Sequence, residues 1–355
     1  GRVALKATLA DTAPFALDAL ADVTSAWRGL PVHAQAIGTL QSFGLTVAIP
    51  AAPAAPAGPV APVAPGAPGA AHAPGPAGTA GSARAVAQVR PFEPVPVGTV
   101  DITVAGLTGD ALGLPAPWSV RIDGSARVVP ARDTTGRWLA QADLDLRNGQ
   151  AGRLDQNAVP LAALSGRLRW DGARVVVDRL DAVLDGRGRV RGAAAYDPAG
   201  SVEMFGRTLP RLDLDLTIDA LDLAQLDARL PASRMTGTAR LDGRAVDVAL
   251  ADAARDGARI EARARVEDGR LLIERARLGA WPGIVDGAVD VAGAIALQAP
   301  HAARLEVGFT RVDPHGLLRL PAALGLSASG AGGPDAAAPA LRGMLDGTLQ
   351  LDGPL

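Results

Sequence analysis

Residues 211–219 read Arg211-Leu212-Asp213-Leu214-Asp215-Leu216-Thr217-Ile218-Asp219, a strict alternation of polar and aliphatic side chains. Successive side chains of a β-strand point to opposite faces of its sheet, so this stretch predicts a strand with one aliphatic and one polar face. Weaker alternation recurs at 101–104, 141–146 and 259–266. The pattern indicates an antiparallel sheet with one face toward water.

Glycines that follow Asp or Asn punctuate these segments. Such pairs supply the positive φ that tight two-residue hairpins require, and we expect a hairpin turn at each of them. They are Asp123-Gly124, Asn148-Gly149, Asp171-Gly172, Asp242-Gly243, Asp256-Gly257, Asp268-Gly269 and Asp286-Gly287. The sequence therefore predicts a meander of antiparallel strands.

A nine-residue pattern of strand and turn repeats at 164–172, 235–243 and 345–353, with a weaker copy at 36–41. Before two of the copies lies a short helical pattern. Asp222 is the expected N-cap of one helix, and Asp313-Pro314 begins the other. The copies are spaced too irregularly for a propeller or an ankyrin array.

Composition excludes several classes of protein. The 355 residues carry a net charge of -2, so the chain presents no basic field for nucleic acid. There is no cysteine, which excludes disulfides, thiolate metal sites and cysteine nucleophiles. Aromatic residues are 3% of the chain although 48% is hydrophobic, so its apolar surface comes from Ala, Val and Leu. The sequence contains no uninterrupted apolar run of the roughly 18 residues that a membrane helix needs.

Proline and alanine dominate one segment. No charged residue occurs between 29 and 83, and prolines recur every third residue from Pro50 to Pro68. This pattern favours a disordered or polyproline II insertion over 50–90. We expect a β-rich segment at 1–49 that continues into the sheet, this insertion, and a repeated β-body at 91–355 with a loop insertion near 325–340.

Signatures of chemistry are weak. The four histidines include no pair at metal-ligand spacing, and neither Ser165 nor Ser233 lies in a nucleophile elbow. Asp143 and Asp145 resemble the start of a calcium loop, but Leu154 stands where the bidentate Glu belongs. We expect no catalytic residue, no metal and no cofactor, and thus a protein that is not an enzyme. The charged side chains are expected to form a mixed, solvated face.

The aliphatic face is the unusual feature. A sheet with so much of it must close on itself, pack on a second layer or hold something apolar. An all-β fold follows, namely an elongated, curled antiparallel sheet shaped as a groove, with a few short helices. The alternative is a closed sandwich or barrel core. The expected lining is Leu144, Leu146, Leu168, Trp170, Leu212, Leu214, Leu216 and Ile218.

Three segments carry a family resemblance. Residues 222–243 read DLAQLDARLPASRMTGTARLDG. The segments PLAALSGRLRWDG at 160–172 and LQLDGPL at 349–355 are similar to parts of this pattern. The repeat resembles that of the TamB family, in the AsmA-like group of bacterial envelope proteins. The resemblance spans most of 91–355 and is weaker over 1–49.

The resemblance implies a periplasmic protein held in the inner membrane by an anchor that is absent from this sequence. It implies phospholipid movement between the inner and outer membranes, a linked role in outer-membrane protein assembly, and an Omp85-type barrel partner. Two alternatives stay open. One is a scaffold or chaperone module that offers strand edges to outer-membrane β-proteins, and the other is a structural, adhesin-like β-protein.

Overall fold

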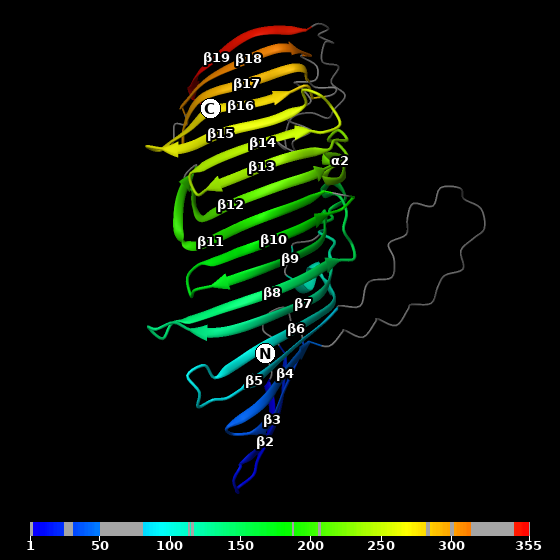
Figure 1. Ribbon diagram of the computed structural model, residues 1–355, viewed down its shortest axis with the longest axis vertical. Helices are drawn as coiled ribbons and strands as arrows, with labels where there is room; N and C mark the ends of the chain where they lie inside the picture. Colours follow the sequence, from blue (N-terminus) through cyan, green and yellow to red (C-terminus); the bar gives the residue numbers. More distant parts are fainter. Residues whose placement is uncertain are drawn as a thin grey trace, which may run out of the picture. The chain divides into compact units, whose positions relative to one another are not determined.

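The computed structural model describes residues 3–24, 31–49, 81–112, 114, 117–186, 188–204, 207–281, 285–298, 302–313 and 344–354 (Figure 1). The expected insertion over 50–80, the loop near 325–340 and the helix after Asp313 lie outside the described residues.

The described chain is all-β, as predicted, and its strands are assigned to one antiparallel sheet that is not closed. Three short helical turns accompany them, namely α1 (Gly109–Leu112), η1 (Leu154–Gln156) and α2 (Leu223–Leu226). The strands are β1 (Val3–Leu9), β2 (Ala16–Thr24), β3 (Pro31–Thr39), β4 (Ser42–Ile49), β5 (Ser82–Val89), β6 (Val97–Thr108), β7 (Arg121–Arg132), β8 (Trp138–Asn148), β9 (Leu161–Trp170), β10 (Val175–Leu184), β11 (Arg189–Met204), β12 (Arg207–Leu221), β13 (Met235–Asp242), β14 (Ala245–Asp252), β15 (Arg259–Glu267), β16 (Arg270–Gly279), β17 (Val285–Ala296), β18 (Ala302–Val312) and β19 (Leu345–Pro354).

Two compact units divide the chain. Unit 1 holds residues 1–151 and 157–165, and unit 2 holds 152–156 and 166–355. Within each unit, strands that follow one another in sequence pair antiparallel, as in β2 with β3 and β12 with β13. Each unit therefore has one edge that carries the odd-to-even hairpins, which we call the hairpin edge, and an opposite edge that carries the even-to-odd connections.

One part of the predicted insertion is wrong. Residues 82–89 form β5, which pairs with β4 on one side and β6 on the other. Its inward face is made of alanines, of which Ala87 is buried. Because alanine is only weakly hydrophobic, the alternation of apolar and polar residues in this strand is weak. The sequence alone therefore does not separate the strand from the proline-rich stretch before it.

A β-bulge recurs near the end of even strands. Gly106 in β6, Ala220 in β12 and Arg311 in β18 have positive φ, and the pairing register shifts at each of them. The backbone N–H of each donates to a side chain of the next strand: Gly106 to Asp123 at 2.7 Å, Ala220 to Thr236 at 3.3 Å, and Arg311 to Asp346 at 2.9 Å. A glycine follows each acceptor, and two of these glycines, Gly237 and Gly347, belong to the repeat.

The structure corrects the prediction for three of the pairs. Asp123-Gly124 lies inside β7 and Asp286-Gly287 inside β17, so neither pair is a turn. Asn148-Gly149 begins the long connection from β8 to β9 that contains η1, and is not a two-residue hairpin. A Cβ on Gly124 would overlap the Asp145 carbonyl oxygen of the following strand, which explains the need for glycine. Asp242-Gly243 and Asp268-Gly269 do connect consecutive strands as predicted.

The sheet of unit 2 curls with its aliphatic face inward. One buried cluster contains Ile218, Leu221 and Met235, and a second contains Trp281 and Val312. Leu223 of α2 packs against both clusters. In a flat sheet β12 and β16, the strand before Trp281, lie four spacings or about 19 Å apart. Side chains cannot bridge that distance, so the strands between them curve around α2.

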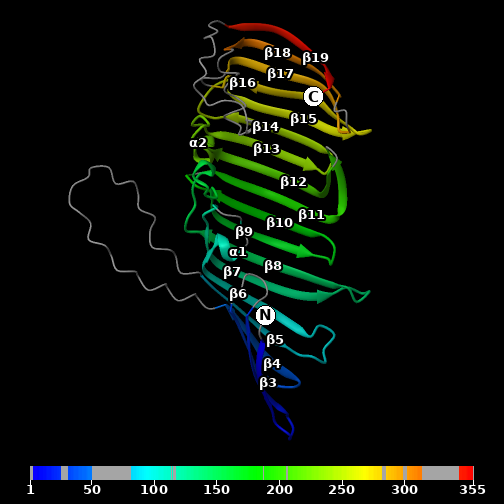
Figure 2. The ribbon, with the colours of Figure 1, turned by 180° about the vertical axis from the view of Figure 1, so that it is seen from behind.

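The short helix predicted after Asp222, with Leu223, Leu226 and Leu230 on one face, is confirmed only over Leu223–Leu226, because the helix ends at Asp227 and Leu230 lies in the turn that follows. Asp222 is the N-cap of α2, and its carboxylate accepts from the backbone N–H of Ala224 at 3.1 Å. Asp227 closes the helix and accepts from the backbone N–H and from Nε of Arg229 at 2.9 and 2.8 Å. Figures 1 and 2 both place α2 at one edge of unit 2.

Asp227 makes the stability of this edge pH-dependent. Its hydrogen bond with the Arg229 guanidinium lowers the pKa of Asp227 from 3.8 to about 2. Because the folded-state pKa is below the unfolded one, this stabilisation is complete above pH ~4 and is lost as pH falls toward 2. Asp227→Asn should lower the free energy of unfolding at pH 7 by about 1 kcal/mol, since Arg229 is half exposed. Urea unfolding at several pH values measures this, and a wild-type-to-mutant difference that stays constant down to pH 2 contradicts it.

Candidate functional site

The candidate site is the aliphatic face of unit 2, which the pairing register arranges in rows that cross the strands. One row runs from strand to strand without a break over β11–β19. Its members are Val190, Ile218, Gly237, Leu250, Ile260, Leu278, Val289, Phe309 and Gly347. Every side chain in it from Val190 to Phe309 belongs to or packs against the two buried clusters. We call it the closing row.

The next row lies two residues closer to the hairpin edge and is less bulky. It contains Gly192, Leu216, Ala239, Val248, Ala262, Ala276, Val291, Val307 and Leu349. A third row, which includes Leu214, Leu241 and Val246, lies two residues further out. These rows give unit 2 a continuous aliphatic surface from the hairpin edge to the closing row.

Exposure on β12 falls from the hairpin edge toward the closing row. On β12, Leu212 is 38% exposed, Leu214 and Leu216 are half-buried, and Ile218 is 9% exposed. Tyr196, the partner of Leu212 on β11, is 43% exposed. On β11 and β12 the face is therefore open at the hairpin edge and closed at the edge that holds α2. Beside β17 and β18 the hairpin edge is itself closed, because Leu297 and Ala303 are each 3% exposed. The aliphatic face of β11 and β12 therefore forms a groove that is closed at the α2 edge.

The predicted lining residues fall into three groups. In unit 2, Leu212, Leu214 and Leu216 share the aliphatic face of β12, and Leu168 and Trp170 lie on β9, where Trp170 is 42% exposed. Ile218 departs from the prediction, because it is part of a buried cluster and forms the base of the groove. In unit 1, Leu144 and Leu146 are half-buried on β8, between exposed polar neighbours.

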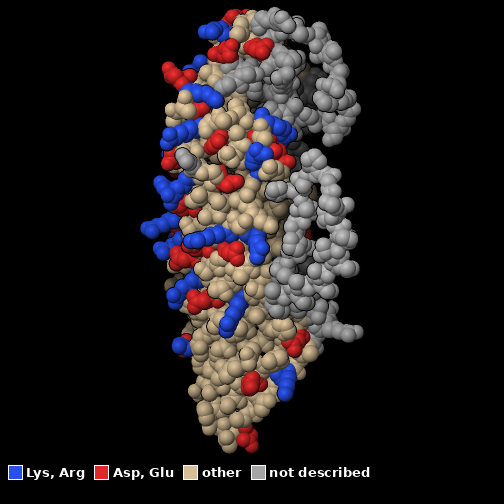
Figure 3. All heavy atoms as spheres, turned by 90° about the vertical axis from the view of Figure 1, so that its right-hand side faces the viewer, with Lys and Arg blue, Asp and Glu red and all other residues tan. Residues whose placement is uncertain are grey.

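The opposite face of unit 2 carries ion pairs between strands, as predicted for a mixed, solvated surface. Arg240 pairs with Asp215 at 3.2 Å, Arg263 with Asp247 at 2.7 Å, and Arg277 with Asp290 at 3.6 Å. Figure 3 shows blue and red side chains interspersed along the left-hand side of the view. Pairs this exposed contribute little stability, but they keep water on their face and prevent the strands from slipping in register.

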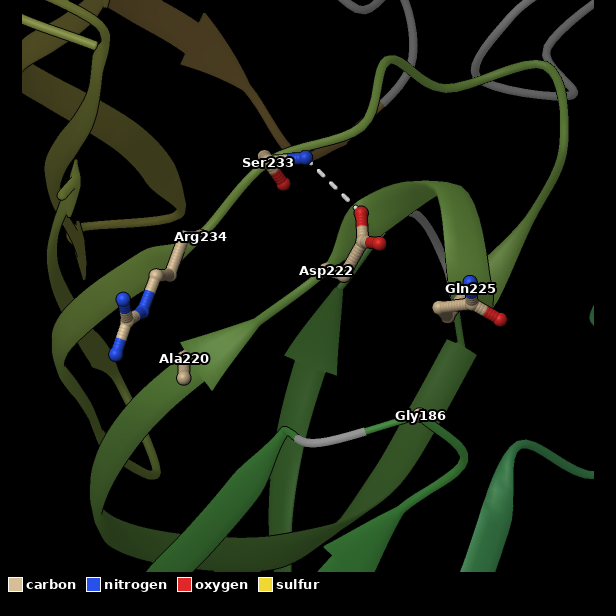
Figure 4. A pocket seen from close by; sticks show the side chains of 6 residues that line it. All are labelled: Gly186, Ala220, Asp222, Gln225, Ser233 and Arg234. Atoms are coloured by element: carbon tan, nitrogen blue, oxygen red, sulfur yellow. Dashed lines mark hydrogen bonds between the residues drawn. The ribbon is translucent and has the colours of Figure 1, made fainter. Parts of the chain in front are cut away.

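A pocket of about 440 Å³ lies beside α2 (Figure 4). It is lined by Gly186, Ala220, Asp222, Gln225, Ser233 and Arg234. The Asp222 carboxylate accepts from the backbone N–H of Ser233 at 2.9 Å, as well as from Ala224. Asp222 therefore fastens α2 to the segment before β13, which is a structural role. Among the described residues, no three His, Asp or Glu side chains come together as a metal site.

Comparisons with family models, with curated proteins and with solved structures find no match to this chain. Within the described ranges, no helix has both the length and the apolar character to span a membrane.

The sequence did not reveal the closing row. Val190, Leu250 and Leu278 come from strands whose alternation is ordinary, and their burial depends on α2 and on Trp281, which are distant in sequence. One feature of the sequence could have indicated the closing row, namely the short helical pattern after Asp222. The leucines of that helix must pack against an apolar surface. That surface is the closing row.

Proposed function

We propose that this chain is a non-enzymatic lipid conduit of the TamB-like type, in which phospholipid acyl chains lie in the aliphatic groove while head groups stay at the open edge. In the cell it would act in the periplasm, bridging inner and outer membranes with an Omp85-type partner and with a linked role in outer-membrane protein assembly. The resemblance of the repeat supports this setting.

The observation that carries the proposal is the gradient of exposure along β12. A closed core would bury Leu212 and Leu214 as deeply as Ile218, yet Leu212 is 38% exposed and Ile218 9%. An aliphatic surface that continues over nine strands is costly to leave in water, at about 25 cal/mol for each Å² of apolar area. Acyl chains remove that cost without requiring any single specific contact.

A scaffold for β-protein assembly is the second candidate, and β19 favours it. This strand pairs with β18, and its Leu345, Leu349 and Leu351 are 44%, 48% and 43% exposed. An exposed strand with apolar side chains is a template for adding another strand. This role predicts capture of polypeptide at β19, whereas the conduit predicts capture of lipid inside the groove.

Site-specific photo-crosslinking in cells separates the two roles. A crosslinking residue at position 214 should capture phospholipid, because Leu214 lies within the groove. The matched control is position 215, the adjacent residue on the polar face, where Asp215 pairs with Arg240. Mass spectrometry identifies the adduct. Equal capture of lipid at both positions, or polypeptide alone at 214, would overturn the conduit.

A further inference from the structure

We propose that the closing row fixes how deeply an acyl chain enters the groove of unit 2, so that the groove selects lipids by chain length. This inference rests on the lipid-binding function proposed above. It adds a property that lipid binding alone does not require, namely a limit on the length of chain that can be sheltered.

The depth of the groove follows from the strand geometry. Residues rise about 3.3 Å each along a strand, so Leu212 at the open edge lies roughly 20 Å from Ile218 and roughly 13 Å from Leu216. One leaflet of a bilayer has about half of the 30 Å hydrocarbon thickness, or roughly 15 Å. An acyl chain of that length, lying parallel to the strands with its head group at Leu212, therefore ends between Leu216 and Ile218, directly in front of the closing row.

The closing row is a fixed barrier because it is part of the packed core. Ile218, Leu250 and Ile260 pack on the cluster that contains Met235, which is 1% exposed. Interiors this well packed do not open for a chain end without leaving cavities elsewhere. A chain longer than the groove must leave its additional methylenes in water. Each of these methylenes lacks the roughly fourfold gain in affinity that a buried methylene provides.

The small side chains of Ala262 and Ala276 leave space in the groove directly in front of the closing row. They face each other across β15 and β16, two residues in front of Ile260 and Leu278 of the closing row. Both are half-buried. A leucine at either position would extend the barrier toward the open edge by one row, or about 7 Å.

The test measures lipids of graded length in unit 2. Monomeric lysophosphatidylcholines with chains of about ten to about eighteen carbons compete for lipid capture by a crosslinking residue at position 264 in the full chain. Ala264 lies two residues in front of Ala262 on β15, in the same row as Leu214. The wild type should bind each longer lipid more tightly until a plateau is reached. Ala262→Leu and Ala276→Leu should reach that plateau about five carbons earlier and bind the longest chains more than tenfold more weakly.

The matched control is Ala249→Leu, which adds the same bulk to an exposed position on the polar face of β14. It should leave the chain-length profile unchanged, and thermal melting should show all three variants folded. Variants that keep the wild-type profile, or a wild-type affinity that rises without a plateau, overturn the depth limit and leave the conduit standing. Absence of competition at every chain length overturns both.

Discussion

Gly237→Ala is expected to destabilise unit 2 by about 4 kcal/mol, a large fraction of the stability of an ordinary domain. Gly237 has a φ of 156° and lies opposite the bulge of β12, with Ile218 as its partner. A Cβ at this position would overlap the carbonyl oxygen of Ala249 in β14. To remove this overlap, β13 and β14 must separate next to Met235, the most buried large side chain of its cluster.

Gly308→Ala is the matched control for this substitution. Gly308 is also a glycine inside a strand of unit 2, but its φ is ordinary and the nearest atom to an added Cβ, on Asp290, is 3.8 Å away. Its free energy of unfolding should change by less than about 0.5 kcal/mol. Chemical denaturation measures both variants. Equal effects at the two positions would show that close approach at the bulge is not the reason for glycine.

Ile218→Asp should unfold unit 2, whereas Leu214→Asp should leave it folded and abolish lipid capture. Both residues are aliphatic and on the same face of β12, four positions apart. Ile218 is buried among hydrophobic side chains, so an aspartate there costs several kcal/mol. Leu214 lies in the open part of the groove, where water can solvate the carboxylate but an acyl chain cannot pass it.

The two variants are compared by thermal melting and by crosslinking at position 241, since Leu241 is the partner of Leu214 on β13. Leu214→Asp should melt near the wild-type temperature and capture less than a tenth of the wild-type lipid. Loss of fold in both variants would mean that the face is a closed core. Retention of lipid by Leu214→Asp would mean that the lipid path avoids this row.

The strands themselves were predictable because side-chain alternation is a local property. The faces of β12, the N-cap Asp222 and the hairpins at 242–243 and 268–269 all follow from neighbouring residues. The bulges do not. Asp123-Gly124 and Asp242-Gly243 have the same two residues, but Asp123 accepts a hydrogen bond from Gly106 of the preceding strand and keeps its own strand extended. That partner is not visible in the local sequence.

The distinction between groove and core was hidden for a related reason. Leu212 and Ile218 occupy equivalent places in the alternation, yet their burial differs because only Ile218 lies under the side chains gathered around α2. The alternation of residues identifies the aliphatic face of a strand. The side chains that bury part of that face come from segments that are distant in sequence. A pattern of this kind therefore predicts the wall of a groove and cannot predict its depth.

Gly347 repeats the backbone geometry of Gly237, with a φ of 152°, but no atom in the described part of the chain lies within 4 Å of an added Cβ. At Gly124, Gly192, Gly237 and Gly293 that space holds the carbonyl of the following strand. A strand paired with β19 in the register of these hairpins would place a backbone carbonyl in the space beside Gly347. The backbone of β19 is therefore already shaped to receive a further strand, and each hairpin added in this register contributes two strand spacings, about 10 Å.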